Sequence, residues 1–238
     1  MTSELMKESI RFYIGADYLI VNNLLWGNGA NLDRGIEAVH RNNLGMIREA
    51  TEMTPAVRWG VSAADGQKLL DAYKRRTPDE ITDVTKAEII KTAITDIHNI
   101  CDAMRPADDE LLLYRNVAEA YAIKDPAVGG TVDIKGITST TTTGQKVDYG
   151  TGDFQITFHK YEIRVPKGMP ILALENDYRN ENEVILPPMR YRIAGLRDGE
   201  DGKVIELEAI APLDVGLLIK DAEGQLAALW GENNDLRK

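Results

Sequence analysis

The spacing of hydrophobic residues changes near Pro106, and this change constrains the fold most strongly. Before it, apolar residues recur every three to four positions, as on one face of a helix. After it, β-branched residues alternate with polar ones between glycine turns, as in strands. Helices followed by strands are typical of the α+β class. We therefore predict a helical part over 1–105 and a β-rich part over 106–238.

The clearest predicted helix runs from Thr85 to Cys101. Its apolar residues form one stripe at helical spacing, which indicates a face buried in the core. Cys101, the single cysteine, follows this stripe, so we expect it on or beside the buried face, with no disulfide within the chain. The stripe comprises Ile89, Ile90, Ala93, Ile94, Ile97 and Ile100.

Seven segments after Pro106 are predicted to form strands, because β-branched and aromatic residues cluster or alternate in them. No stretch rich in proline, serine and glycine divides the chain, so we expect one domain over 1–238. The predicted strands cover residues 110–115, 131–141, 153–166, 170–175, 183–187, 190–195 and 204–210.

The charge balance limits the classes of partner. The chain has 38 acidic and 28 basic residues, a net charge of −10, which argues against a broad surface for nucleic acid. We expect the compact cationic cluster of Lys74, Arg75 and Arg76 to be a solvated helix end.

The sequence shows no apolar run or leader pattern that predicts a membrane segment, so we expect a cytosolic protein. The three histidines lie too far apart for a zinc motif, and we expect no metal.

The stretch "YRNENEVILPP" places two glutamates directly before a short apolar run. In an extended segment Glu181 and Glu183 point to the same side, about 7 Å apart. The apolar run predicts a buried strand, which the double proline ends. The two carboxylates are therefore expected at a strand entrance, either as a solvated face or as a functional pair. By contrast, "VIELEAI" is an ordinary amphipathic strand.

Two further segments carry polar groups that need an explanation. In "LLLYRN", Arg115 ends an apolar strand, and a half-buried cation there requires a carboxylate or a phosphate as its partner. In "GITSTTTTG", a serine and five threonines lie between two glycines. An edge strand explains most of this run, because threonine favours strands, and a functional hydroxyl stays open as the alternative.

The order of these segments resembles the Arg-Ser-Glu class of mono-ADP-ribosyltransferases, which includes clostridial and cholera-type toxins and arginine-specific enzymes. The block "YEIRVPKGMPILALENDYRNENEVILPPMRYRIAG" is similar to the family's strand, Pro-Lys-Gly turn, substrate loop and Glu-x-Glu strand. "DYLIVNNLLWGN" resembles a family helix more loosely, with Trp26 where arginine is common. Two further departures are Asn116 in place of a usual glycine and Thr141 in place of a second serine.

This resemblance implies a fold and an activity. The helices are expected to pack on a mostly antiparallel β core of two sheets, in a single ADP-ribosyltransferase-like domain. The activity is cleavage of the co-substrate NAD at its nicotinamide–ribose bond and transfer of ADP-ribose to a macromolecular acceptor. Glutamate at position 181 goes with arginine acceptors in the family, so protein arginine is the first expectation.

The resemblance also assigns roles to single residues. Glu183 stabilises the transition state, Ser139 holds Glu183, and Glu181 orients and deprotonates the acceptor. Tyr178 either joins Glu181 in recognising the target or packs within its own loop. Arg115, the fourth residue of the catalytic set, pairs with the NAD phosphates or braces the site. The residues expected to contact NAD are Arg115, Asn116, Ser139, Thr140 and Glu183, and no metal is implied.

Several alternatives remain open at the level of sequence. The acceptor can be RNA instead of protein, or water, which would make the protein an NAD glycohydrolase. A non-catalytic binding or structural module with the same fold is the rival from another class. As a toxin or phage-type effector, the protein would act in the cytoplasm of its producer or of a target cell, and its producer would need an inhibitory partner or antitoxin.

Overall fold

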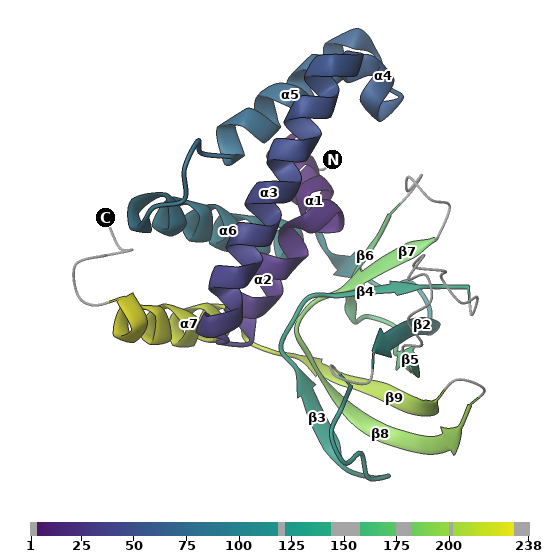
Figure 1. Ribbon diagram of the computed structural model, residues 1–238. Helices are drawn as coiled ribbons and strands as arrows, with labels where there is room; N and C mark the ends of the chain where they lie inside the picture. Colours follow the sequence, from purple (N-terminus) through teal and green to yellow (C-terminus); the bar gives the residue numbers. More distant parts are fainter. Residues whose placement is uncertain (1–3, 119–121, 144–157, 175–181, 200–201, 231–238) are drawn as a thin grey trace. The chain divides into compact units, whose positions relative to one another are not determined.

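The computed structural model describes residues 4–118, 122–143, 158–174, 182–199 and 202–230 (Figure 1). They form two compact units. A helical unit comprises Met1–Ile100 and Gly216–Lys238, and a β unit comprises Cys101–Val215. The prediction of an α+β fold is confirmed.

In the helical unit, α3 runs along α2 and also contacts α4 and α5 (Figure 1). Side chains stabilise two helix starts: Asn28 accepts a hydrogen bond from Asn31 N at the start of α3, and Ser62 accepts one from Asp65 N at the start of α5. A π-helical turn, η1, separates α1 from α2. The elements are α1 (Glu4–Phe12), η1 (Tyr13–Asp17), α2 (Tyr18–Leu25), α3 (Gly29–Met53), α4 (Pro55–Trp59), α5 (Ala63–Arg76), α6 (Asp83–Ala103) and α7 (Val215–Trp230).

The predicted apolar stripe lies on α6 and faces the core. Ile90, Ile97 and Ile100 are fully buried, as expected for residues at helical spacing on one face. Cys101 lies on the same helix and is half-buried, and burial raises the pKa of its thiol to about 12. The thiol is therefore protonated and a poor nucleophile near neutral pH.

No helix was predicted after the last strand, whereas α7 follows it and belongs to the helical unit. Gly216 and Gly224 lower the helix propensity of this segment, which obscured the pattern. Ile219 and Ala222, three residues apart, are both buried, so tertiary packing supports this helix where propensity does not.

The β unit forms one nine-stranded sheet in the order β1-β6-β7-β4-β2-β5-β9-β8-β3. Its pairings between the described strands are antiparallel, except for the parallel pair of β5 and β9. The strands are β1 (Arg105–Pro106), β2 (Leu111–Ala118), β3 (Thr131–Ile134), β4 (Thr138–Thr141), β5 (Phe158–Val165), β6 (Pro170–Ala173), β7 (Glu183–Leu186), β8 (Met189–Asp198) and β9 (Lys203–Pro212).

The two expected sheets are joined into one at β2. This strand pairs with β5 along its whole length, and with β4 through a single pair, Tyr114 with Thr141. The single pair is enough to connect the β1-β6-β7-β4 half to the β2-β5-β9-β8-β3 half. The predicted strand 131–141 is also divided, into β3 at one edge of the sheet and β4 near its middle. The bend at Gly136 separates them.

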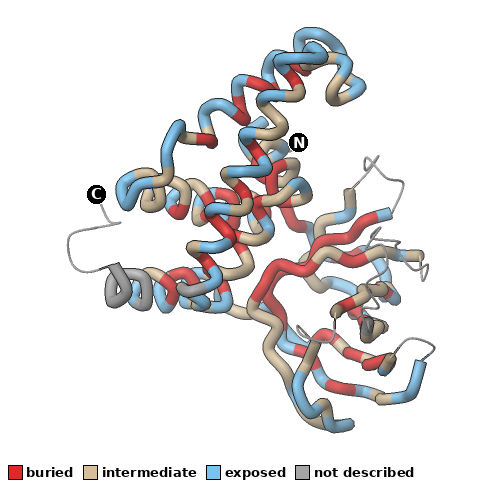
Figure 2. Tube along the Cα trace, viewed as in Figure 1, coloured by how far each residue is buried: buried red, intermediate tan, exposed pale blue. Residues whose placement is uncertain are grey.

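The core of the β unit includes residues of β2, β5, β7, β8 and β9. Buried residues run without a break from Glu183 to Met189, so β7 is enclosed on both faces (Figure 2). The amphipathic pattern predicted for β9 is confirmed: buried Ile205, Leu207 and Ala209 alternate with half-buried glutamates. Those glutamates pair with arginines of β8.

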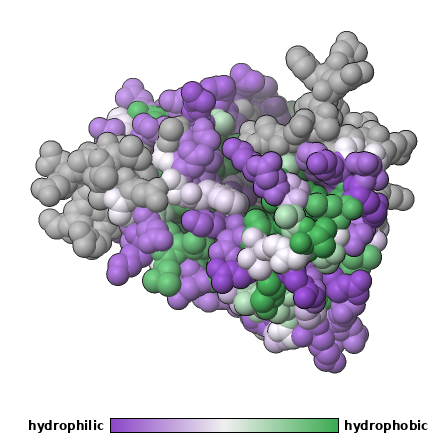
Figure 3. Space-filling view, turned by 90° about the horizontal axis from the view of Figure 1, so that it is seen from below, coloured by the Kyte–Doolittle hydropathy of each residue, from purple (hydrophilic) through white to green (hydrophobic). Residues whose placement is uncertain are grey.

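Hydrophilic side chains predominate on the face shown in Figure 3, and hydrophobic ones gather there in patches. Among the described residues, no helix has both the length and the apolar character that a membrane span requires.

Candidate active site

The pairing of β4 with β7 brings a serine hydroxyl to a buried carboxylate. Ser139 lies opposite Ile185, and Thr141 lies opposite Glu183. Residues two apart on a strand share one face, so Ser139 is a diagonal neighbour of Glu183. Ser139 Oγ donates a hydrogen bond to Glu183 Oε1, and Glu183 is only 8% exposed. The hydroxyl thus fixes the direction of one carboxylate oxygen.

The backbone on either side of Glu183 holds the start of β7 in place. Asn182 adopts φ 47°, a left-handed conformation that asparagine tolerates better than most residues. Its carbonyl accepts a hydrogen bond from Thr142 N at 3.3 Å, and the carbonyl of Glu183 accepts one from Leu174 N at 3.0 Å. Strand entry at Glu183, predicted from the sequence, is therefore confirmed.

Arg115 of β2 contacts β4, the strand that carries Ser139. Its Nη1 donates a hydrogen bond to the backbone carbonyl of Ser139 at 2.8 Å. No carboxylate forms an ion pair with this guanidinium in the described part of the chain. The anionic partner expected from the sequence is thus absent from those residues, and a carbonyl group occupies one of the five donors.

The positive charge of Arg115 affects the pKa values of two buried tyrosines. Burial raises the pKa of Tyr161 and of Tyr191, and the positive charge of Arg115 opposes this rise in both. Tyr161 Oη accepts a hydrogen bond from Ile123 N at 2.8 Å. The half-buried Arg115 therefore places a positive charge beside the apolar core.

Arg115, Ser139 and Glu183 form one connected chain of hydrogen bonds across β2, β4 and β7. The guanidinium braces the strand that carries the serine, and the serine orients the carboxylate. A carboxylate that is buried and held in this way can stabilise a positive charge that develops on a bound ligand, without first reorganising water around it.

The comparisons with known proteins bear on the fold that carries this site. No family model and no curated protein matches the sequence. Among solved structures, the ADP-ribosylating toxin BECa, from a binary enterotoxin of C. perfringens, is similar with a TM-score of 0.52 and 14% sequence identity over 88% of this chain. The chain has the ADP-ribosyltransferase fold. It spans 44% of the BECa chain.

Another similar structure is the catalytic domain of VahC from Aeromonas hydrophila. The match covers 88% of this chain and 99% of that domain, with 18% identity and a TM-score of 0.49.

Within the ADP-ribosyltransferase fold, Thr140 has a different setting from Ser139. It is 4% exposed, and its Oγ1 donates a hydrogen bond to the carbonyl of Val184 at 2.5 Å. Successive residues of a strand point to opposite faces, so this hydroxyl fastens β4 to β7 on the face away from Ser139. A contact of Thr140 with NAD stays a prediction.

The other predicted site residues divide into two groups. Asn116 lies on β2 opposite Lys160, and Lys160 Nζ lies 4.7 Å from the centre of the Tyr114 ring. Lys160 was not predicted as a site residue, because an isolated lysine on a strand has no distinguishing sequence pattern. Tyr178 and Glu181 lie outside the described residues. The described residues contain no cluster of histidine, cysteine and carboxylate side chains that could hold a metal ion.

Proposed function

We propose that the protein is a mono-ADP-ribosyltransferase that cleaves NAD and transfers ADP-ribose to an arginine side chain of a protein. The observation that carries this proposal is the hydrogen bond from Ser139 to the buried Glu183, braced by Arg115, within the ADP-ribosyltransferase fold. BECa was solved with NADH, which supports a nicotinamide dinucleotide as the ligand class.

Glu183 supplies the electrostatic part of the reaction. When the nicotinamide–ribose bond breaks, the bonding electrons leave with nicotinamide and positive charge develops on the ribose. A carboxylate aimed at this charge stabilises the transition state more than the ground state, as carboxylates do in glycosidases. An acceptor nitrogen then bonds to the ribose carbon and loses a proton, for which Glu181 is the proposed base.

Ser139 and Arg115 position the reacting groups. The Ser139 hydroxyl donates a hydrogen bond to Glu183 Oε1 and so orients this carboxylate toward the position proposed for the ribose. Arg115 uses Nη1 on the carbonyl of Ser139, and its remaining donors match the planar geometry of a pyrophosphate. We therefore propose an anionic group of the ligand as the partner of Arg115.

The test is nicotinamide release from labelled NAD, measured with and without a lysate and with purified arginine-containing proteins. We expect release to increase with the acceptor and the label to appear on protein. Release that no acceptor increases would instead identify an NAD glycohydrolase, and label on RNA would identify the nucleic-acid variant. If the protein neither released nicotinamide nor bound NAD, the result would favour the non-catalytic module.

Replacing Glu181 by Gln separates transfer from cleavage. We expect Glu181→Gln to lower transfer to arginine at least about 10-fold and to leave most NAD hydrolysis intact, because the amide cannot accept the acceptor's proton. Both reactions are measured on the same samples. An equal loss of both would place Glu181 in the NAD site instead of the acceptor site.

A further inference from the structure

A second cluster of buried charges lies within the helical unit, around Arg76. The sequence predicted a solvated helix end at residues 74–76, and for Arg76 this is wrong. Its side chain is 12% exposed, and its guanidinium carbon lies 4.1 Å from the centre of the Phe12 ring. Lys74 and Arg75 are exposed as expected. The acidic residues that draw Arg76 inward are distant in sequence, so the local pattern did not reveal them.

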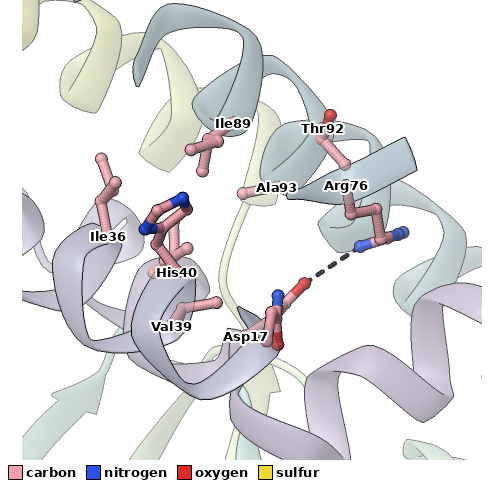
Figure 4. A pocket seen from close by; sticks show the side chains of 10 residues that line it. Asp17, Ile36, Val39, His40, Arg76, Ile89, Thr92 and Ala93 are labelled. Atoms are coloured by element: carbon pink, nitrogen blue, oxygen red, sulfur yellow. Dashed lines mark hydrogen bonds and ion pairs between the residues drawn. The ribbon is translucent and has the colours of Figure 1, made fainter. Parts of the chain in front are cut away.

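The carboxylates around Arg76 are held unequally. Asp96 accepts two hydrogen bonds, from Nη1 at 2.8 Å and from Nη2 at 2.7 Å. Asp17 accepts one, from Nη1 to Oδ2 at 3.0 Å, as the dashed line in Figure 4 marks. Asp17 Oδ1 is buried and has no hydrogen-bond partner. Asp17 is therefore the less stabilised of the two anions.

The charges in this cluster do not balance. Glu8 lies near Arg76 Nε at 3.3 Å and also pairs with the exposed Arg75 at 3.1 Å. If Arg75 neutralises Glu8, Asp17 and Asp96 share the single positive charge of Arg76. Both aspartates are at least 92% buried. An unbalanced buried charge is costly, and a proton on one carboxylate removes it.

The remaining neighbours that line the cavity engage other groups or are neutral. His40 of α3 uses its Nε2 to donate a hydrogen bond to the carbonyl of Pro78 at 2.7 Å and not to Asp17. Asn43 of α3 and Thr92 of α6 also line it and are neutral. The cavity has room for a water molecule. A proton on a carboxylate is therefore the simplest way for this site to remove its excess negative charge.

The backbone that carries Asp17 is itself unusual. Asp17 is the last residue of η1, the π-helical turn between α1 and α2. Such turns are rare and are found frequently at functional sites. In this position the turn directs a carboxylate toward α5 and α6, so the cluster joins the N-terminal helices to two other elements of the unit (Figure 4).

We propose that Asp17, Arg76 and Asp96 form a proton-linked switch of the helical unit, in which folding places a proton on Asp17 and loss of that proton weakens the unit. The switch is local to this unit and does not depend on the proposed activity.

The direction of the pH effect follows from the environment of Asp17. Burial, and then the charge of Asp96, raise its pKa from 3.8 to about 7, although Arg76 opposes the rise. A carboxyl group with a raised pKa in the folded state binds its proton more tightly there than in the unfolded chain. Its contribution to stability is complete below about pH 4 and is lost as the pH rises through about 7.

The test compares the wild type with Asp17→Asn in urea unfolding of the full chain. Tryptophan fluorescence reports the helical unit, because Trp26, Trp59 and Trp230 all belong to it. As the pH rises from 5 to 8.5, Asp17 loses its proton, and we expect this loss to increase the unfolding equilibrium constant of the wild type about 100-fold. The variant, which has no carboxyl group at this position, should lack this increase. Asn keeps an oxygen that can accept from Arg76, so the fold should persist.

Asp33→Asn is the matched control, because Asp33 lies in the same unit and pairs with Lys86 at 2.9 Å near the surface. It should keep the wild-type pH profile. A carbon NMR titration of the Asp17 carboxyl group in the wild type gives an independent result even if the variant unfolds. A midpoint below pH 5, or an unchanged pH profile in folded Asp17→Asn, would overturn the proposal.

Discussion

Replacing Glu183 by Gln is expected to lower NAD cleavage at least about 100-fold, the size of a principal electrostatic contribution to a transition state. Transfer of ADP-ribose should fall by the same factor, because both reactions pass through cleavage of the same bond. Nicotinamide release at saturating NAD measures the first effect, and labelling of the acceptor measures the second.

The substitution removes charge while preserving shape. Gln has the length of Glu, and its amide oxygen can still accept the hydrogen bond from Ser139 Oγ. The buried setting of β7 also limits movement, since the residues from Glu183 to Met189 are all buried. A loss of activity in a folded variant would therefore report the missing negative charge and not a displaced strand.

Glu206→Gln provides the matched control for this experiment. Glu206 also lies on a strand of the β unit, and it pairs with Arg197 at 3.3 Å outside the site. We expect its activity to stay within about two-fold of the wild type, because a surface ion pair contributes little. If folded Glu183→Gln retained wild-type turnover, the assignment of Glu183 would be refuted.

Local patterns predicted the elements that depend on local spacing. The stripe on α6 and the strand entry at Glu183 follow from residues three, four or two positions apart, and both are confirmed. The division of 131–141 into β3 and β4 was missed because pairing partners decide it: β3 pairs with β8, whereas β4 pairs with β2 and β7. Strand pairing between distant segments leaves only a weak signal in the local sequence, which here is Gly136.

The candidate site shows the same limit. The resemblance brought Arg115, Ser139 and Glu183 together as one motif, and the structure connects them by hydrogen bonds. From the sequence alone we predicted an anionic partner for Arg115. The hydrogen bond to the carbonyl of Ser139 could not be predicted, because every residue has a backbone acceptor and its use leaves no sequence pattern. The same reasoning explains Arg76, whose partners at positions 17 and 96 are far away in the chain.

Replacing Arg76 by Met should produce the largest loss of stability, about 3–5 kcal/mol near pH 8, because it leaves two buried carboxylates without a counter-charge. Methionine keeps an apolar stem that can still pack on the Phe12 ring, so the loss reports charge more than volume. Urea unfolding followed by tryptophan fluorescence measures it. At pH 5 the loss should be smaller, because Asp17 is then protonated and one of the two charges is gone.

The neighbouring Arg75→Met is the control, since it removes the same charge one residue away. The Arg75 side chain is 62% exposed and pairs with Glu8 at 3.1 Å, so its loss should be at most about 1 kcal/mol at either pH. Equal losses for the two arginines would mean that the cluster around Arg76 is solvated like an ordinary surface pair. A large loss of stability in Arg76→Met alone, smaller at pH 5 than at pH 8, would instead indicate that this single guanidinium is the counter-charge of two buried carboxylates.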